Sequence, residues 1–355
     1  MNKGMSEKFS IFYVSCINNE RKHPDYDDDY GEWALSKGFL FSSAKSYGLT
    51  ENNYNEYLSD EDFYKSWPLN SWTKIWVDDK LTLKYILEGT KFSHLMPKYY
   101  FYSNNNSELR KLVDNPYGDD IQVLINLIKK HRNIACKPNN GTQSAGFCRL
   151  SYDGSSLYIN KDKASESDIE LFVKSHPNYI FTEYLVPEKR IAEIHRLIYT
   201  LRLVTLNTKG NNPIIIGGYL RFGTDNHGEA NHLSINDDCK ATFDFVSEVN
   251  IENGHIGNSK SIYFNKVVNT LAHPNTGVVV DFNIHNWNDI KSQVLELSKY
   301  LCNLEFIGFD FGITDNGIKL MEVNTHPGIK YMQVFKSLYD NKIVKDYFMK
   351  KLNTK

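Results

Sequence analysis

The sequence of 355 residues predicts an α+β fold, in which helices and strands are mixed without the strict βαβ alternation of a parallel sheet. Two parts of the chain carry this prediction. Ile121–His131 repeats isoleucine and leucine at intervals of three and four residues, which is the spacing of an amphipathic helix. Phe306–Thr314 and Ile318–Asn324 are strand-like runs on either side of Asp315-Asn316-Gly317, a turn sequence typical of a β-hairpin.

The other elements follow from the same patterns in chain order. The first 75 residues look irregular, and we interpret their acidic run, Asp25–Asp29, as a solvated loop. Apolar spacing predicts helices further along the chain, and runs of β-branched and aromatic residues predict strands. The predicted helices are Lys80–Leu87, Asp168–Ser175, Asp289–Leu301 and Met332–Lys351. The predicted strands are Asn133–Lys137, Phe147–Ser151, Tyr179–Tyr184, Ile198–Asn207, Ile214–Phe222 and Gly277–Phe282.

Composition excludes several classes of protein. Lysine plus arginine total 41 and aspartate plus glutamate total 43, so the formal charge is −2, which argues against a nucleic-acid partner. No apolar run approaches the ~18 residues of a membrane-spanning helix, so we expect no integral membrane segment. The five cysteines are scattered and form no CxxC pair, which predicts reduced thiols and a cytoplasmic location. The sequence leaves the oligomeric state open.

The predicted hairpin carries three oxygen-bearing side chains. Glu322 and Asn324 share one face of their strand because side chains alternate. A two-residue loop at Asn316-Gly317 would set Asp310 opposite Val323, whereas a three-residue loop that includes Asp315 would set Asp310 opposite Glu322. We expect the three-residue loop.

Two carboxylates and an amide oxygen on one face suit Mg²⁺ or Mn²⁺ better than zinc. The neighbouring Gly308 and Gly312 are expected to leave room for a bulky ligand to approach the sheet. The other interpretation is a pair of acidic residues on a solvated sheet face. Apolar neighbours along the same strand make that interpretation weaker.

Three further features are candidates for binding negatively charged groups. Lys137 ends a strand before a loop of small residues, Asn139–Gly146, whose backbone N–H groups could cradle phosphate oxygens. Such a loop can equally be an ordinary hairpin. Arg202 and Arg221 lie in apolar strands, where an inward-facing arginine needs an anionic partner and an outward-facing one is only a surface group. His273 is either a site residue or a structural histidine.

Together these segments resemble the ATP-grasp superfamily. Glu322-Val-Asn324-Thr-His326-Pro-Gly328 is similar to the closing metal motif of D-alanine–D-alanine ligases. The segments around Arg202, Arg221, His273 and Gly308 resemble the sugar-transfer-associated ATP-grasp group, and the resemblance covers about residues 78–335. It implies an ATP-grasp fold in which two α+β subdomains sandwich ATP. The implied parts are an N-terminal region (1–75), a small subdomain with the phosphate loop (76–188) and a large subdomain with the metal site (189–355).

The resemblance also implies roles for single residues. Asp310, Glu322 and Asn324 would bind Mg²⁺ or Mn²⁺, while Arg202 and Arg221 would act on the phosphates or the acyl phosphate. The residues implied to hold ATP are Lys80, Lys137, Gly141, Ser144, Gly146, Glu183, Tyr184 and Leu185. Weaker matches suggest substrate contacts at Asn231, His273 and His326. Thr200 stands where many superfamily members have a glutamate that grips ribose, so the ribose contact is expected elsewhere.

The implied activity is that of an ADP-forming ligase that joins a carboxylate to an amine through an acyl phosphate. Its substrates would be a small-molecule carboxylate and an amine, with a sugar acid or an amino acid as candidates, in bacterial surface-polysaccharide or amino-acid conjugate biosynthesis. The alternative is a kinase with the same fold that phosphorylates a sugar-like or peptide substrate. A third class is a nucleotide-binding protein without turnover, and the intact set of metal and phosphate residues argues against it.

Overall fold

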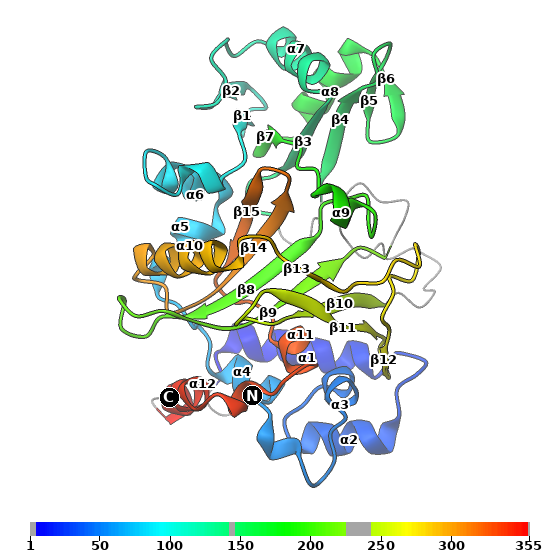
Figure 1. Ribbon diagram of the computed structural model, residues 1–355, viewed down its shortest axis with the longest axis vertical. Helices are drawn as coiled ribbons and strands as arrows, with labels where there is room; N and C mark the ends of the chain where they lie inside the picture. The colour runs from blue at the N-terminus through cyan, green and yellow to red at the C-terminus, as the bar shows by residue number, and fades with distance from the viewer. Residues whose placement is uncertain (1–4, 142–145, 225–242, 354–355) are drawn as a thin grey trace.

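Two sheets lie one above the other along the long axis of the protein (Figure 1). The structure is a computed structural model that describes residues 5–141, 146–224 and 243–353, and the structural statements below concern these residues. All strand pairs in both sheets are antiparallel in the part of the chain that the structure describes. Helices are mixed with these strands, which confirms the predicted α+β class.

The smaller sheet occupies the upper part of Figure 1 and has the strand order β2-β1-β7-β3-β4-β5-β6. Its strands are β1 (Tyr99–Ser103), β2 (Leu109–Lys111), β3 (Asn133–Pro138), β4 (Cys148–Tyr152), β5 (Leu157–Ile159), β6 (Asp162–Ala164) and β7 (Tyr179–Glu183). Helices α7 (Ile121–His131) and α8 (Glu166–Ser175) cover one face. Leu124 of α7 and Ile169 of α8 share one apolar core with Ile134 and Phe181 of the sheet.

The larger sheet has the strand order β12-β11-β10-β9-β8-β14-β15, and β13 also pairs with β11. Its strands are β8 (Thr200–Leu206), β9 (Ile214–Phe222), β10 (Asp244–Val249), β11 (His255–Ile262), β12 (Val267–Asn269), β13 (Phe282–Asn283), β14 (Phe306–Thr314) and β15 (Gly317–Asn324). The helices of this half are α9 (Lys189–Ala192), α10 (Trp287–Tyr300), α11 (Lys330–Gln333) and α12 (Lys342–Asn353).

Side-chain alternation gives the larger sheet two different faces. Leu203 of β8 and Phe309 of β14 point to the face that α10 and α6 (Lys80–Leu87) cover. Val204 and Phe306 point to the opposite face, which packs against helices from both ends of the chain. This second face is apolar only at one end. Arg202 lies on the same side of β8 as Val204, and Asp310 lies on the same side of β14 as Phe306, so the other end of the face is charged.

Residues 5–75 contain several helices, so the prediction of an irregular segment is wrong. Their α-helices are α1 (Glu7–Glu20), α2 (Asp28–Ser36), α3 (Phe41–Tyr47) and α4 (Asp60–Lys65), with α5 (Ile75–Asp78) following. The acidic run is exposed, as predicted, but only Asp25–Asp27 form a loop, because Asp28 and Asp29 lie in the first turn of α2. The side chain of Asp27 caps this helix and accepts a hydrogen bond from Tyr30 N at 3.0 Å. Helices α2, α3 and α4 are short, and aromatic residues that they share with the sheet core take the place of a long apolar stripe. Helix α1 has 14 residues but buries only Ser10 and Tyr13.

Two other elements differ from the prediction. The predicted strand Gly277–Phe282 is reduced to a bridge at Val279 and the two residues of β13. The predicted helix Met332–Lys351 is divided into α11, a short 3₁₀-helix (Leu338–Asp340) and α12. The side chain of Gln333 accepts from Leu58 N at 3.1 Å and donates to Leu58 O at 2.9 Å, which ties the break to the N-terminal region.

The β14–β15 hairpin has the predicted pairing of Asp310 with Glu322, but its turn differs from the predicted one. Its turn has two residues, because Thr314 pairs with Gly317. A β-bulge then adds one residue to β15, and Asp310 pairs with Glu322. The pairing of the two carboxylates is therefore confirmed, whereas the three-residue loop is wrong. None of the helices in the described ranges is long and apolar enough to cross a membrane.

Candidate functional site

Three neighbouring strands place a row of charged side chains at the polar end of the larger sheet. Asp310 of β14 lies between Glu322 of β15 and Arg202 of β8. Arg202 Nη2 donates to Asp310 Oδ2 at 2.7 Å, and Arg202 Nε donates to the other oxygen. Asn324 Nδ2 donates to Asp310 Oδ2 at 3.1 Å. The structure therefore brings the three predicted metal ligands together, with an arginine beside them.

Gly308 allows this close arrangement. A Cβ atom at Gly308 would lie 2.7 Å from Pro327 Cβ and 3.0 Å from Arg202 Cδ. A Cβ atom at Gly312 would lie 2.8 Å from side-chain atoms of Ile198. The expectation that these glycines leave room for a ligand is wrong, because the protein's own side chains fill both spaces.

The charges around Glu322 connect the two sheets. Burial raises the pKa of Glu322, Lys80 opposes that rise, and Asp310 adds to it. Lys137 and Arg202 also act to lower the pKa of Glu322. Glu322 is thus a half-buried carboxylate with one anionic and three cationic neighbours, two of which belong to segments outside the larger sheet.

Both predicted phosphate-binding lysines lie in this environment. Lys80 begins α6 and is 6% exposed, and its Nζ donates to Gly141 O at 2.7 Å. Burial lowers the pKa of Lys80, against the attraction of Glu322. Lys137 lies near the end of β3, where burial lowers its pKa to about 8 and the ammonium of Lys80 contributes in the same direction. Two ammonium groups that repel each other in this way favour a ligand that carries several negative charges.

A set of hydrogen bonds holds the beginning of the phosphate loop against α6. Asp79 caps this helix, and its Oδ1 accepts from Thr82 N at 2.7 Å. Its Oδ2 accepts from Asn139 Nδ2 at 2.5 Å and from Asn140 Nδ2 at 3.1 Å. Asn139 Oδ1 accepts from Leu81 N at 2.9 Å. Asp79 is not among the predicted site residues, although an aspartate directly before a predicted helix is a capping signal.

The predicted adenine segment begins at Glu183, the last residue of β7. Glu183 Oε2 accepts from Lys98 N at 3.1 Å, and Glu183 N donates to Lys98 O at 2.8 Å. The ring of Tyr184 lies 5.9 Å from the guanidinium carbon of Arg149, and Leu185 is half-buried.

Two predicted loop residues stand outside the described ranges, and a third is fixed by its backbone. Ser144 and Asn231 lie outside the residues that the structure describes. Gly146 has φ +76°, and a Cβ atom there would lie 2.5 Å from Tyr179 Oη, so this position requires glycine.

Arg221 lies on β9 and belongs to a second arginine–aspartate pair. Its Nη2 lies 3.1 Å from Asp244 Oδ1, and Tyr331 donates its hydroxyl hydrogen to Asp244 Oδ2. Arg221 pairs across the sheet with Thr200, two residues from Arg202, so both arginines point to the same face.

The two histidines predicted to contact substrate pack among apolar side chains. His273 has no exposed surface, and its Nε2 lies 3.0 Å from Gly223 O, with the ring of Phe245 centred 5.2 Å away. His326 lies 4.3 Å from the ring of Trp67, and burial lowers its pKa to about 4. His326 is therefore neutral at pH 7.

The donor set of the row fits Mg²⁺ or Mn²⁺. Within the described ranges, no three His, Cys, Asp or Glu side chains form a metal cluster, so the site depends on Asp310, Glu322 and the amide oxygen of Asn324. Each carboxylate oxygen has two lone pairs, and Asp310 can therefore accept from Arg202 and still contact an ion. A divalent ion would also stabilise two carboxylates that lie directly opposite each other. Magnesium commonly completes such a partial set with water and phosphate oxygens.

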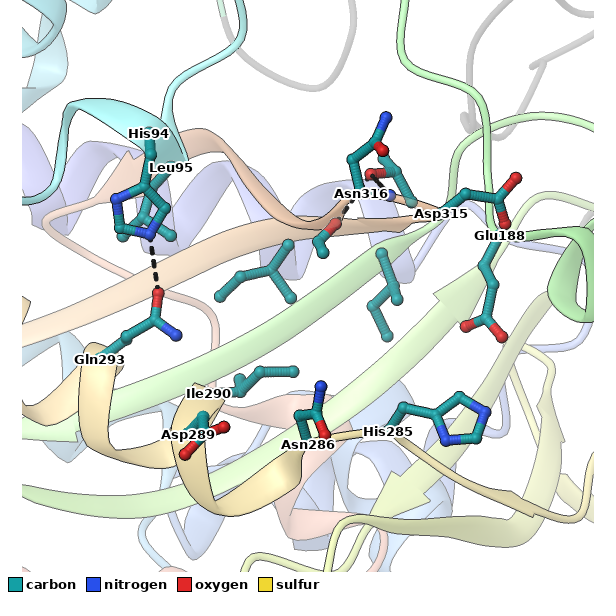
Figure 2. A pocket seen from close by; sticks show the side chains of 14 residues that line it. His94, Leu95, Glu188, His285, Asn286, Asp289, Ile290, Gln293, Asp315 and Asn316 are labelled. Atoms are coloured by element: carbon teal, nitrogen blue, oxygen red, sulfur yellow. Dashed lines mark hydrogen bonds between the residues drawn. The ribbon is translucent and has the colours of Figure 1, made fainter.

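A separate cavity of about 400 Å³ lies at the turn of the same hairpin. Figure 2 shows Asp315 and Asn316 of this turn across from Asn286, Asp289 and Gln293, at and beyond the start of α10. None of the predicted site residues lines this cavity. The charged row and this cavity therefore belong to different ends of the β14–β15 hairpin.

Comparison with known families gives one sequence match. The family described as sugar-transfer associated ATP-grasp matches residues 64–343. None of the curated proteins matches the chain.

Several solved structures resemble the chain at low identity. D-alanyl-alanine synthetase A from Vibrio cholerae is 15% identical, with a TM-score of 0.43, and the match covers 78% of this chain and 66% of that one. D-alanine–D-alanine ligase from Bacillus anthracis is 13% identical, with a TM-score of 0.36 and coverage of 78% and 68%. L-amino acid ligase from Bacillus licheniformis is 11% identical, with a TM-score of 0.36 and coverage of 73% and 42%.

Proposed function

Because this chain belongs to the sugar-transfer-associated ATP-grasp family, we propose that it is an ATP-dependent ligase that joins a carboxylate to an amine and forms ADP. Its fold is the α+β ATP-grasp fold that the sequence predicts. The observation that carries the proposal is the row of Glu322, Asp310 and Arg202, with which the ammonium groups of Lys80 and Lys137 interact. Such a row can hold a divalent ion and the phosphates of a nucleotide at once.

Each part of the site has a role in this proposal. Lys80 and Lys137 bind phosphate oxygens, and the segment from Glu183 to Leu185 meets the adenine. Mg²⁺ bound by Asp310, Glu322 and Asn324 would supply positive charge that neutralises the phosphates during transfer. Asp310 holds the guanidinium of Arg202 in one orientation through two hydrogen bonds, so that the arginine can stabilise charge on the transferred phosphate.

The proposed reaction has two steps. A carboxylate oxygen of the first substrate attacks the γ-phosphorus of ATP, the bond to the β-phosphate oxygen breaks, and an acyl phosphate and ADP form. The nitrogen of the amine then attacks the acyl carbon, phosphate leaves, and the nitrogen loses a proton as the amide forms. No side chain of the protein acts as a nucleophile in either step. We place the reaction in surface-polysaccharide or amino-acid conjugate biosynthesis.

The test is a phosphate-release assay with ATP, Mg²⁺, a panel of uronic acids and amino acids, and mass spectrometry of the products. We expect release of phosphate that requires both an acid and an amine, together with an amide product. Glu322→Ala and Asp310→Ala are expected to lower turnover at least 100-fold. Asp315→Ala is the matched control, because Asp315 lies at the far end of the same hairpin.

Two results would contradict the proposal. Full turnover of both the Glu322 and the Asp310 variants would show that the row does not support the reaction. Transfer of phosphate to a hydroxyl group without phosphate release would identify a kinase instead.

A further inference from the structure

We propose that the acid substrate binds beside helix α11, where β9 ends and β10 begins, and that Lys330 and Arg221 hold a carboxylate of that substrate. The inference rests on the proposed function and extends it, because it gives the N-terminal helices a part in substrate recognition. The ligand class is a small carboxylic acid.

The order of the strands in the larger sheet places the proposed acid site away from the proposed nucleotide site. Lys80 and Lys137 interact with Glu322 on the edge strand β15, and Asp310 and Arg202 follow on the next two strands. Arg221 lies one strand further, about 10 Å from the strand of Asp310 at the usual ~4.8 Å spacing. If the lysines bind the phosphates of the nucleotide, its terminal phosphate lies near Asp310 and Arg202 and does not reach Arg221. Arg221 is then on the side of the terminal phosphate from which the acid must approach.

Lys330 supplies a second cation, which interacts electrostatically with Asp244, the partner of Arg221. It follows the motif that contains Asn324, and its Nζ donates to Ser42 Oγ of α3 at 3.0 Å. No carboxylate oxygen of the described residues lies within 4 Å of this ammonium. Burial lowers the pKa of Lys330, while Glu20, Asp60 and Asp244 favour its charged form from a longer distance.

An ammonium group has three N–H donors, and the described residues use one of them in Lys330. A buried cation is stable when an anion or several acceptors surround it. The carboxylate of a ligand would complete this environment, with the hydroxyl of Ser42 as a further partner.

Tyr331, the residue after Lys330, contacts side chains that lead to the row of Glu322, Asp310 and Arg202. Tyr331 donates to Asp244, which pairs with Arg221. Its ring packs at 5.3 Å against Tyr219, whose ring lies 5.9 Å from the guanidinium carbon of Arg202. Contacts through Tyr331 therefore connect Lys330 and Arg221 to Arg202, which we propose acts on the terminal phosphate.

The experiment is titration calorimetry with D-glucuronate and L-glutamate as probes, with and without Mg-ADP. We expect Lys330→Met to weaken binding of an acid at least tenfold and to change Mg-ADP affinity less than twofold. Arg221→Gln is also expected to weaken binding of the acid at least tenfold. Lys330→Arg is expected to restore most of the affinity, because it keeps the charge. Lys336→Met, an exposed lysine of the same segment, is the matched control.

The outcomes separate this inference from the proposed function. Unchanged acid affinity in Lys330→Met, or a wild-type protein that binds neither acid, would overturn the inference. Acid binding that depends on Lys330 in a protein that releases no phosphate would support the site and count against the ligase. Melting curves followed by circular dichroism show whether each variant is folded at the temperature of the titration.

Discussion

Lys137 has a charge that changes close to neutral pH. Burial lowers its pKa to about 8, and repulsion from Lys80 contributes, whereas Glu322 acts in the opposite direction. The ammonium is present below pH 8 and is lost as the pH rises through 8. An exposed lysine keeps its proton to about pH 10.4, so this loss comes from the position of Lys137 in the fold.

The first prediction concerns this titration. The affinity for Mg-ATP should fall as the pH rises from 7 to 9, because the neutral amine no longer attracts phosphate. Lys137→Arg should bind with an affinity that is nearly constant over this range, since arginine stays charged. Calorimetric Kd values at pH 7, 8 and 9 test the expectation, and an equal pH dependence in the wild type and the arginine variant would contradict it.

At the scale of elements, the connection between α6 and β3 positions the lysines. The carboxylate of Asp79 accepts from Thr82 N, Asn139 Nδ2 and Asn140 Nδ2. One side chain therefore caps the helix that begins with Lys80 and anchors the start of the phosphate loop. The same carboxylate favours the charged form of Lys80.

The second prediction is that Asp79→Ala lowers the free energy of unfolding by about 1 kcal/mol, the typical contribution of a helix N-cap. It should also weaken Mg-ATP binding about tenfold, because Lys80 loses its anchor. Urea denaturation and calorimetry measure the two effects. Asp120→Ala is the matched control, since Asp120 precedes α7 without a side-chain capping bond. Equal effects of both variants would show that the hydrogen bonds of Asp79 have no special role.

At the scale of the whole molecule, the N-terminal helices complete the core of the larger sheet. Phe39, Leu58 and Phe63 pack in one cluster with Val204 and Phe306. Figure 1 shows these helices below the sheet, beside α12 from the other end of the chain. The division of the chain at residues 75 and 188 remains a proposal, and the shared core argues that residues 1–75 do not fold apart from the sheet.

The third prediction is that removal of residues 1–66 abolishes stable folding, because it exposes the apolar end of this face to water. Circular dichroism should show no cooperative melting transition. Ile11→Ser is the control, because Ile11 is 65% exposed and contributes little to the core. A shortened protein that melts cooperatively near the wild-type temperature would contradict the prediction.

Local patterns correctly predicted the elements in which apolar residues repeat at a regular helical or strand spacing. Ile121–His131 and Lys80–Leu87 are helices with the predicted bounds, and β9 and β14 also match. The N-terminal helices were missed for two reasons. Helices α2, α3 and α4 are short and pack aromatic residues against distant strands. Helix α1 has 14 residues but buries only Ser10 and Tyr13, so it shows no apolar stripe. The segment after residue 332 was predicted as one helix, and contacts with Leu58 divide it.

The sequence by itself determined the types of side chain in the site, because carboxylates, an amide, lysines and arginines have the same chemistry in any fold. It also determined which strand holds Asp310 and which holds Glu322. Only the tertiary structure decided their pairing, because an extra residue at a bulge sets the register and no local pattern marks it. Tertiary structure likewise brought Lys80 and Lys330 to their places, since burial and electrostatic interaction depend on segments far apart in the chain.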